Sequence, residues 1–226
     1  MSKSIKITEG ADIKEVALGF SDARVKTMCG KLTESIERRH SFELTQGLAM
    51  TGATSWEKAR KQLEASQIAV ARMFLALNLE PAAVIERQAV EGKMFNAKAI
   101  KKIVELAQFT CGMPGKIERV TKAFIACALI ASDKNPGSAI TNAVNQRFLG
   151  NKDLSTLITD KDILDNLDDL RHKSMSTGAE TQSSQARNVL DVLGLGTITT
   201  VTRARDAVVL NLDSPFYGLF RKAVMV

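Results

Sequence analysis

Hydrophobic side chains recur at every third or fourth position over most of the chain from Asp12 to Gly150, which is the spacing of one buried helix face. The clearest stripe begins at Trp56 and continues through Leu63, Val70 and Leu77 before Pro81. We therefore predict helices over Ser21–Arg39, Ser55–Leu77, Asn96–Phe109 and Ile117–Ser132, and a further helix that Ser138 caps and Gly150 ends. The segment Ile117–Ser132 is apolar on all sides after Lys122, which is typical of a central, buried helix.

Beyond Gly150 the pattern changes. An acidic stretch, Asp160–Leu170, keeps a leucine-rich helical face, and Thr181–Leu193 is a second amphipathic helix that Gly194 and Gly196 end. Every residue of Thr197–Thr202 is β-branched and Ala207–Leu212 is almost wholly apolar, so both segments are typical of strands. A tight turn at Arg203–Asp206 would join them into a hairpin.

These patterns predict a mainly α protein with two parts. Residues 1–150 form a multi-helix N-terminal body, and residues 151–226 form a small α+β module of helix and β-hairpin. The length of 226 residues and the hydrophobic content of 45% suit a folded chain with a substantial core.

Charge and composition narrow the class of protein. The net charge is +6 and its distribution is uneven: residues 1–150 carry +7, residues 151–170 carry −4, and residues 171–226 carry +3. Two basic regions around an acidic strip suit a polyanionic partner, and they equally suit a protein with an acidic surface helix. Aromatic residues are only 5% of the chain, so stacking platforms for single strands are poorly supported.

Cellular location is predicted from the cysteines and the hydrophobic runs. Cys29, Cys111 and Cys127 are widely spaced and form no CxxC pair, which favours a reducing compartment over a disulfide framework or a zinc site. The longest apolar run, Ala123–Ala131, is far shorter than the roughly 20 residues that cross a bilayer. The first residues lack the apolar core of a signal peptide. We expect a cytoplasmic protein with no membrane association.

The order of helix, stop and hairpin from Ser174 to Leu212 resembles the second half of a winged-helix nucleic-acid-binding module. The resemblance implies a support helix at Asp160–Leu170, a recognition helix at Thr181–Leu193 and a wing tip at Arg203–Asp206. The side chains that would then face the nucleic acid are Thr181, Ser184, Arg187 and Asn188 on the helix and Arg203 and Arg205 on the wing. The alternative is a small helix and hairpin that close a core, with the arginines merely exposed.

Lysines provide a second candidate surface. Lys98, Lys101 and Lys102 cluster on one side of the Asn96–Phe109 helix, and Lys116 ends the turn CGMPGK that follows. The GxxG pattern of that turn is similar to the backbone-clamping loop of KH-type RNA binders. A solvated helix face and an ordinary helix–helix turn remain the alternatives. The turn is not a phosphate-binding P-loop, because Thr110 replaces the first glycine and Ile117 the hydroxyl residue.

No pattern for catalysis, metal binding or a cofactor is found in the sequence. His40 and His172 have no nucleophile motif nearby, and the aspartates of Asp160–Leu170 miss the spacing of a calcium loop. We therefore expect a non-enzymatic protein that binds DNA or RNA. The alternative is a self-assembling helical scaffold, for which the apolar segment Phe216–Phe220 offers a contact between copies. Folding of that segment onto the chain's own core is also open.

Overall fold

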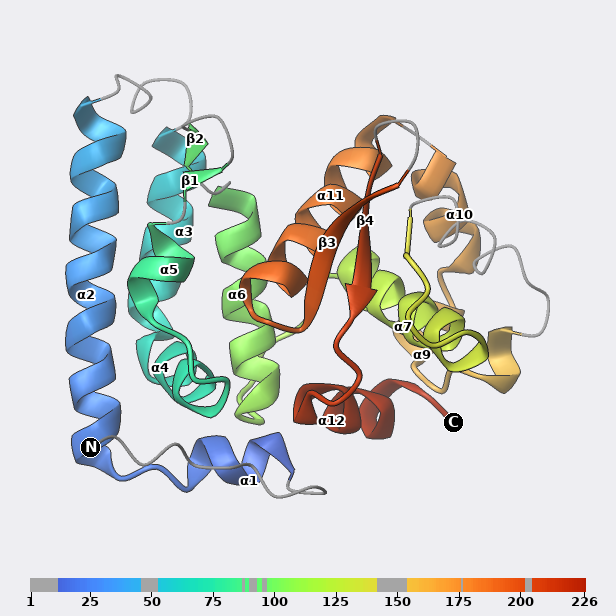
Figure 1. Ribbon diagram of the computed structural model, residues 1–226, viewed down its shortest axis with the longest axis horizontal. Coiled ribbons are helices and arrows are strands. Elements are labelled where there is room, and N and C mark those ends of the chain that lie inside the picture. Colours follow the sequence, from blue (N-terminus) through green and yellow to red (C-terminus); the bar gives the residue numbers. More distant parts are fainter. Residues whose placement is uncertain are drawn as a thin grey trace.

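The computed structural model describes residues 12–45, 53–86, 88–89, 93–94, 97–141, 154–175, 177–201 and 205–226. The chain is mainly α, with a small α+β unit at its C-terminal end (Figure 1). This confirms the fold class that the hydrophobic pattern predicts. In the described part of the chain, no helix is both long enough and apolar enough to cross a membrane.

The N-terminal half is a layered set of helices. Its elements are α1 (Ile13–Leu18), α2 (Asp22–Thr45), α3 (Ala53–Ala65), α4 (Gln67–Ala76), α5 (Pro81–Ile85), β1 (Gln88–Ala89), β2 (Lys93–Met94), α6 (Ala97–Thr110) and α7 (Arg119–Lys134). The long helix α2 forms the outer layer on the left of Figure 1 and packs against α4 and α5, while α3 and α4 pack against α6. β1 and β2 pair as a short antiparallel ladder.

The helix predicted over Ser55–Leu77 is two helices, because the chain breaks at Ser66. The Ser66 N–H donates to the carbonyl oxygens of Gln62 and Leu63, at 3.0 and 3.2 Å, and its Oγ accepts a hydrogen bond of 2.9 Å from Gln108. The break changes the direction of the chain, so that α4 can contact α1, α2 and α6. A continuous hydrophobic stripe cannot reveal such a break, since both helices keep the same spacing.

Helix α7 is the buried helix that its composition predicts. Every residue from Thr121 to Ser132 is buried. The small side chains, such as Ala126 and Ala128, let neighbouring elements approach on more than one side. Among these neighbours are α11, α9 and β4 of the C-terminal half, which are defined next.

The C-terminal half contains the 3-10 turn η2 (Leu154–Thr156), α9 (Lys161–Leu164), α10 (Leu167–Met175), α11 (Thr177–Val192), β3 (Gly196–Val201), β4 (Arg205–Leu210) and α12 (Pro215–Val224). The acidic helix predicted over Asp160–Leu170 is therefore two short helices. Asp160 caps α9 by accepting from the Ile163 N–H at 3.0 Å, and the Asn166 side chain donates to the Asp162 carbonyl at 3.0 Å in the break. These local side-chain bonds compete with a continuous helix.

The hairpin forms as predicted, and a third segment extends it. β3 and β4 are antiparallel from Gly196 opposite Leu210 to Val201 opposite Arg205. Ile140 bridges to Val208 of β4 through two backbone hydrogen bonds of 2.8 and 3.1 Å. The expectation of a helix starting at Ser138 is thus wrong for residues 138–141; the rest of that prediction lies outside the described residues.

A close approach at the base of the hairpin requires glycine. A Cβ at Gly196 would lie 2.6 Å from Cγ2 of Val208 and 2.9 Å from the Val209 carbonyl oxygen. Because the second of these atoms is backbone, any larger residue would push the two strands apart.

The C-terminal aromatic segment folds onto the protein's own core. Phe216, Tyr217 and Phe220 are each at most 1% exposed, and the rings of Phe216 and Phe220 lie 6.1 and 6.0 Å from that of Phe109 on α6. The Tyr217 hydroxyl donates to the Leu195 carbonyl at 2.5 Å. The expectation that this segment presents an apolar contact for a second copy therefore loses its basis.

One hydrophobic core joins the two halves. α11 packs against α6 and α7, and α12 packs against α1. Contacts between the predicted body and the predicted module are therefore extensive. The boundary expected at residues 150–151 itself lies outside the described residues.

Candidate nucleic-acid interface

Helix α11, the predicted recognition helix, is enclosed on most sides. It packs against α6, α7, α10, β3 and β4, and the face of Ala186, Val189, Leu190 and Leu193 is buried as the spacing predicts. The half-exposed stripe consists of Ser184, Asn188 and Asp191. The side chain of Thr181 lies outside the described residues.

Arg187 does not face solvent, which corrects the expected orientation. Arg187 is only 8% exposed, and Gln185, two residues before it, is 4% exposed. The expectation assumed that α11 buries a single face, as a surface helix does. In the folded chain, helix α6 also packs against α11, so positions that would be outward on an isolated module are covered.

Asp191 fixes the helix to the hairpin. One carboxylate oxygen of Asp191 accepts a hydrogen bond of 3.2 Å from the backbone N–H of Ile198 in β3. A carboxylate used in this way satisfies a strand donor and holds β3 in place relative to α11. Because Asp191 is used in this way, Ser184 and Asn188 are the remaining accessible polar side chains of the half-exposed stripe on α11.

Part of the predicted hairpin tip belongs to a strand. Arg205 and Asp206 are the first residues of β4 and pair with Val201 and Thr200 of β3, so they are not part of the tip. Arg203 lies outside the described residues, as does the side chain of Arg205. The backbone nevertheless places Arg205 at the end of the hairpin that is farthest from Gly196.

The lysines of α6 do not share one surface. Lys101 is exposed and makes no ion pair within the described part of the chain, whereas Lys102 is only 3% exposed. Lys102 pairs with Glu118 and donates to the Thr121 hydroxyl at 2.6 Å, so its charge is used inside the protein. The side chain of Lys98 lies outside the described residues.

Lys116 belongs to an ion network around Asp162. Lys116, Arg119 and Lys122 all approach the Asp162 carboxylate, at 3.0, 3.0 and 3.3 Å. Burial raises the pKa of Asp162, but the hydrogen bonds from the three cations outweigh it and hold the pKa at about 2. Lys122 also pairs with Asp160 at 2.8 Å.

The sequence interpretation missed this network, because it treated the aspartates as a solvated face. A usable signal was present: Lys116, Arg119 and Lys122 are three residues apart, which places them on one side of the start of α7. The network neutralises Lys116 and attaches α9 to α7, so its cations are engaged within the chain.

The accessible predicted residues lie on two helices that pack together, α6 and α11. The β3–β4 hairpin packs against α11, and its Val201–Arg205 end lies towards the top of Figure 1. Lys101, Ser184 and Asn188 are the predicted residues with described, accessible side chains on these elements. Lys102, Lys116 and Arg187 are paired or buried elsewhere.

Comparisons with protein-family models, with curated proteins and with solved structures find no match to this chain. Among the residues that the structure describes, no group of three or more histidine, cysteine, aspartate or glutamate side chains could hold a metal ion.

Proposed function

We propose that this protein is a non-enzymatic nucleic-acid-binding protein whose interface is the surface that carries Lys101 on α6, Ser184 and Asn188 on α11, and the turn end of the β3–β4 hairpin. The observation that carries the proposal is the pairing of Ile140 with Val208 of β4. It adds a third segment to the hairpin, which supports a winged-helix-like arrangement of the C-terminal unit.

The element order of a winged-helix module is helix, strand, helix, helix and hairpin. In this proposal α7 is the first helix, the segment at Ile140 is the first strand, α10 is the second helix and α11 is the third, with η2 and α9 between the strand and α10. The sequence pattern placed the support helix at Asp160–Leu170 instead. With α7 as the first helix, the described elements are compatible with such a module.

This surface suits contacts to the phosphate backbone better than sequence-specific contacts to base edges. α11 is packed between α6 and the hairpin, so it cannot enter a major groove along its whole length. Its accessible polar side chains, Ser184 and Asn188, are of types that hydrogen-bond phosphate or sugar oxygens. Lys101 adds a positive charge on an exposed side chain that makes no ion pair within the described residues.

The backbone adds to the same electrostatic preference. The positive ends of the dipoles of α6 and α11, helices of 14 and 16 residues, lie at the N-terminal ends of these helices, where they favour an anion. The net charge of +6 favours the approach of a polyanion in general. Binding of this kind would be strongly dependent on salt and weakly dependent on sequence.

A salt titration tests the proposal. Binding of fluorescein-labelled double-stranded DNA, single-stranded DNA and double-stranded RNA of equal length is followed by anisotropy between about 50 and 200 mM salt. We expect the association constant for at least one of the three to fall steeply as the salt concentration rises. No binding at low salt, or an affinity that salt leaves unchanged, would contradict it.

The alternative, a self-assembling helical scaffold, makes a different prediction. If the protein is such a scaffold, light scattering after size exclusion would show large assemblies that contain no nucleic acid. The segment that suggested it, Phe216–Phe220, is packed inside the chain, with Phe216 and Phe220 completely buried. We therefore place nucleic-acid binding first.

A further inference from the structure

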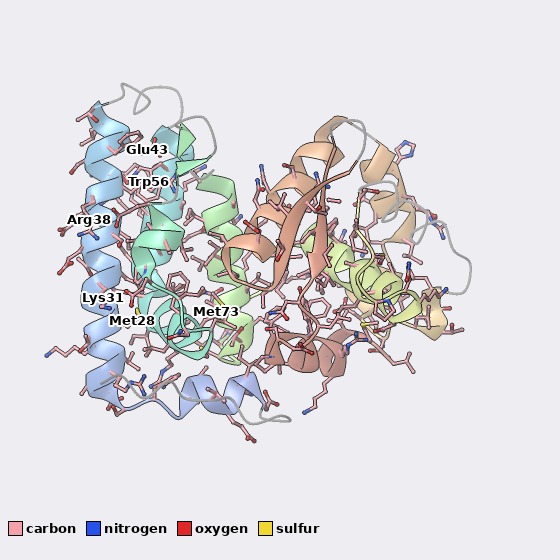
Figure 2. All side chains as sticks on the ribbon, viewed as in Figure 1. Met28, Lys31, Arg38, Glu43, Trp56 and Met73 are labelled. Atoms are coloured by element: carbon pink, nitrogen blue, oxygen red, sulfur yellow. The ribbon has the colours of Figure 1, made fainter. Side chains whose placement is uncertain are left out.

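A pocket of about 360 Å³ lies between the first turns of α2 and the C-terminal end of α4, far along the chain from the proposed interface. Its lining comes from both helices and from the turn after α4, and it includes Arg24, Thr27, Met28, Leu75, Asn78 and Leu79. Figure 2 shows Met28 and Lys31 on the lower half of α2, beside α4. The volume lies within the range of roughly 300–1,000 Å³ that is typical of small-molecule sites.

The lining divides into an apolar floor and a polar rim. Met28, Leu75 and Leu79 supply hydrocarbon surface, and Phe74 is fully buried beneath them. The rim carries groups that can hydrogen-bond, among them the hydroxyl of Thr27 and the side-chain amide of Asn78. A ligand that fits both parts must have an apolar body and a polar end.

The charged side chains on the rim favour an anionic ligand. Lys31 and Glu80 neutralise each other, since the lysine Nζ donates to both carboxylate oxygens at 3.0 and 2.9 Å. Arg24 makes no ion pair in the described part of the chain, and its guanidinium carbon lies 4.7 Å from the centre of the Phe20 ring. The rim therefore keeps one positive charge, and a guanidinium can bind a carboxylate through two parallel hydrogen bonds.

The shape of the rim is preformed by the end of α4. Asn78 adopts φ 54°, its N–H donates to the Leu75 carbonyl, and the Leu79 N–H donates to the Phe74 carbonyl at 2.8 Å. These bonds are those of a Schellman C-cap, which fixes the directions of Asn78 and Leu79. A pocket held by backbone hydrogen bonds loses little entropy when a ligand binds.

We propose that the α2–α4 pocket binds a small amphipathic carboxylate, with its carboxylate on Arg24 and its hydrocarbon tail on Met28, Leu75 and Leu79. The site does not depend on the nucleic-acid proposal, because it uses none of the same residues. An aliphatic chain of medium length matches the floor, and a carboxylate matches a single unpaired guanidinium better than an uncharged head group does.

Octanoate is the probe, and its binding is followed by amide chemical-shift changes in the full chain. We expect saturable changes at residues 23–31 and 74–80 with a dissociation constant in the millimolar range, as befits so small a ligand. Arg24→Gln removes the charge from an exposed position and should weaken octanoate binding about tenfold, the effect of losing a charge-assisted hydrogen bond.

Two controls make the result decisive. Lys26→Gln removes the same charge from an exposed position on α2 that does not line the pocket, and it should leave octanoate binding unchanged. Octan-1-ol, which has the tail without the carboxylate, should bind wild-type protein no better than Arg24→Gln binds octanoate. Absence of saturable shifts, equal effects of the two substitutions, or equal binding of the alcohol and the acid would each overturn the proposal.

Discussion

The guanidinium carbon of Arg39 lies 4.5 Å from the ring centre of Trp56, and this pair joins α2 to α3 inside the core. Arg39 is only 1% exposed; it donates to the Ile85 carbonyl at 3.0 Å and pairs with Glu43 at 3.1 Å. Burial lowers the pKa of Arg39, and the hydrogen bonds that Arg39 donates to the Glu43 carboxylate oppose that shift. Figure 2 shows Trp56 and Glu43 near each other in the upper part of the N-terminal half.

Replacing Arg39 should therefore destabilise the protein strongly. Arg39→Ala leaves Glu43 and the Ile85 carbonyl without their buried partner, so the free energy of unfolding should fall by about 3–5 kcal/mol. Urea denaturation followed by Trp56 fluorescence measures it. The adjacent Arg38 is the matched control: its ion pair with Glu86 is at the surface, and Arg38→Ala should cost much less. Equal losses for the two variants would contradict a structural role for Arg39.

Asp162 should make stability depend on pH at the acid end. Its pKa is about 2 in the folded protein, below the ordinary value of 3.8, so its contribution is complete above about pH 4 and is lost as the pH falls towards 2. At pH 6, Asp162→Asn should lower the free energy of unfolding by about 1–2 kcal/mol. The difference between wild type and variant should shrink as the pH is lowered below about 4. The control is Asp168→Asn, which removes an almost fully exposed carboxylate; its difference from wild type should stay near zero throughout.

Asn78 should be replaceable by glycine but not by alanine. Its φ of 54° lies in the left-handed region, where a Cβ costs roughly 1–2 kcal/mol and asparagine is better tolerated than alanine. Asn78→Ala should lower the free energy of unfolding by about 1 kcal/mol, and Asn78→Gly should leave it unchanged or raise it. Thermal denaturation of the two variants measures this. A glycine variant less stable than the alanine variant would show that the side-chain amide, rather than the backbone, matters here.

Lys101 should contribute to nucleic-acid affinity. Removing one phosphate contact lowers the salt slope by about 1, so Lys101→Gln should weaken binding about fivefold at 100 mM salt for all sequences alike. Anisotropy with the nucleic acid that the wild type prefers measures both quantities. Lys26→Gln, on the part of α2 at the lower edge of Figure 1, removes one charge away from the proposed interface. If both variants bind equally weakly, only the net charge of the protein matters, and the proposed surface around Lys101 is not the interface.

The helical pattern predicted much of the fold correctly because it depends on local spacing. The buried faces of α6, α7 and α11 and the strands of the hairpin follow from residues close in sequence, such as Val189 and Leu193 or the β-branched run after Gly196. Two of the errors, the break at Ser66 and the break at Asp165 and Asn166, come from side chains that bond to the backbone or to another helix.

The candidate site was predicted less well, because exposure depends on what else packs against an element. Arg187 and Lys102 occupy positions that would be outward on single amphipathic helices, and contacts with other parts of the chain cover them. The pairing of Ile140 with Val208 joins residues far apart in sequence, which no local pattern can specify.

The sequence by itself determined the helical class, the buried seam of α11 and the presence of a hairpin, since these follow from hydrophobic periodicity and backbone preference. Only the tertiary structure decided which charges remain free. Lys116, Arg119 and Lys122 form ion pairs with Asp162, and Lys102 forms one with Glu118. Lys101 and Arg24 make no ion pair within the described residues. The physical reason is that an ion pair depends on distances of a few ångströms between elements, and those distances are set by packing across the whole core.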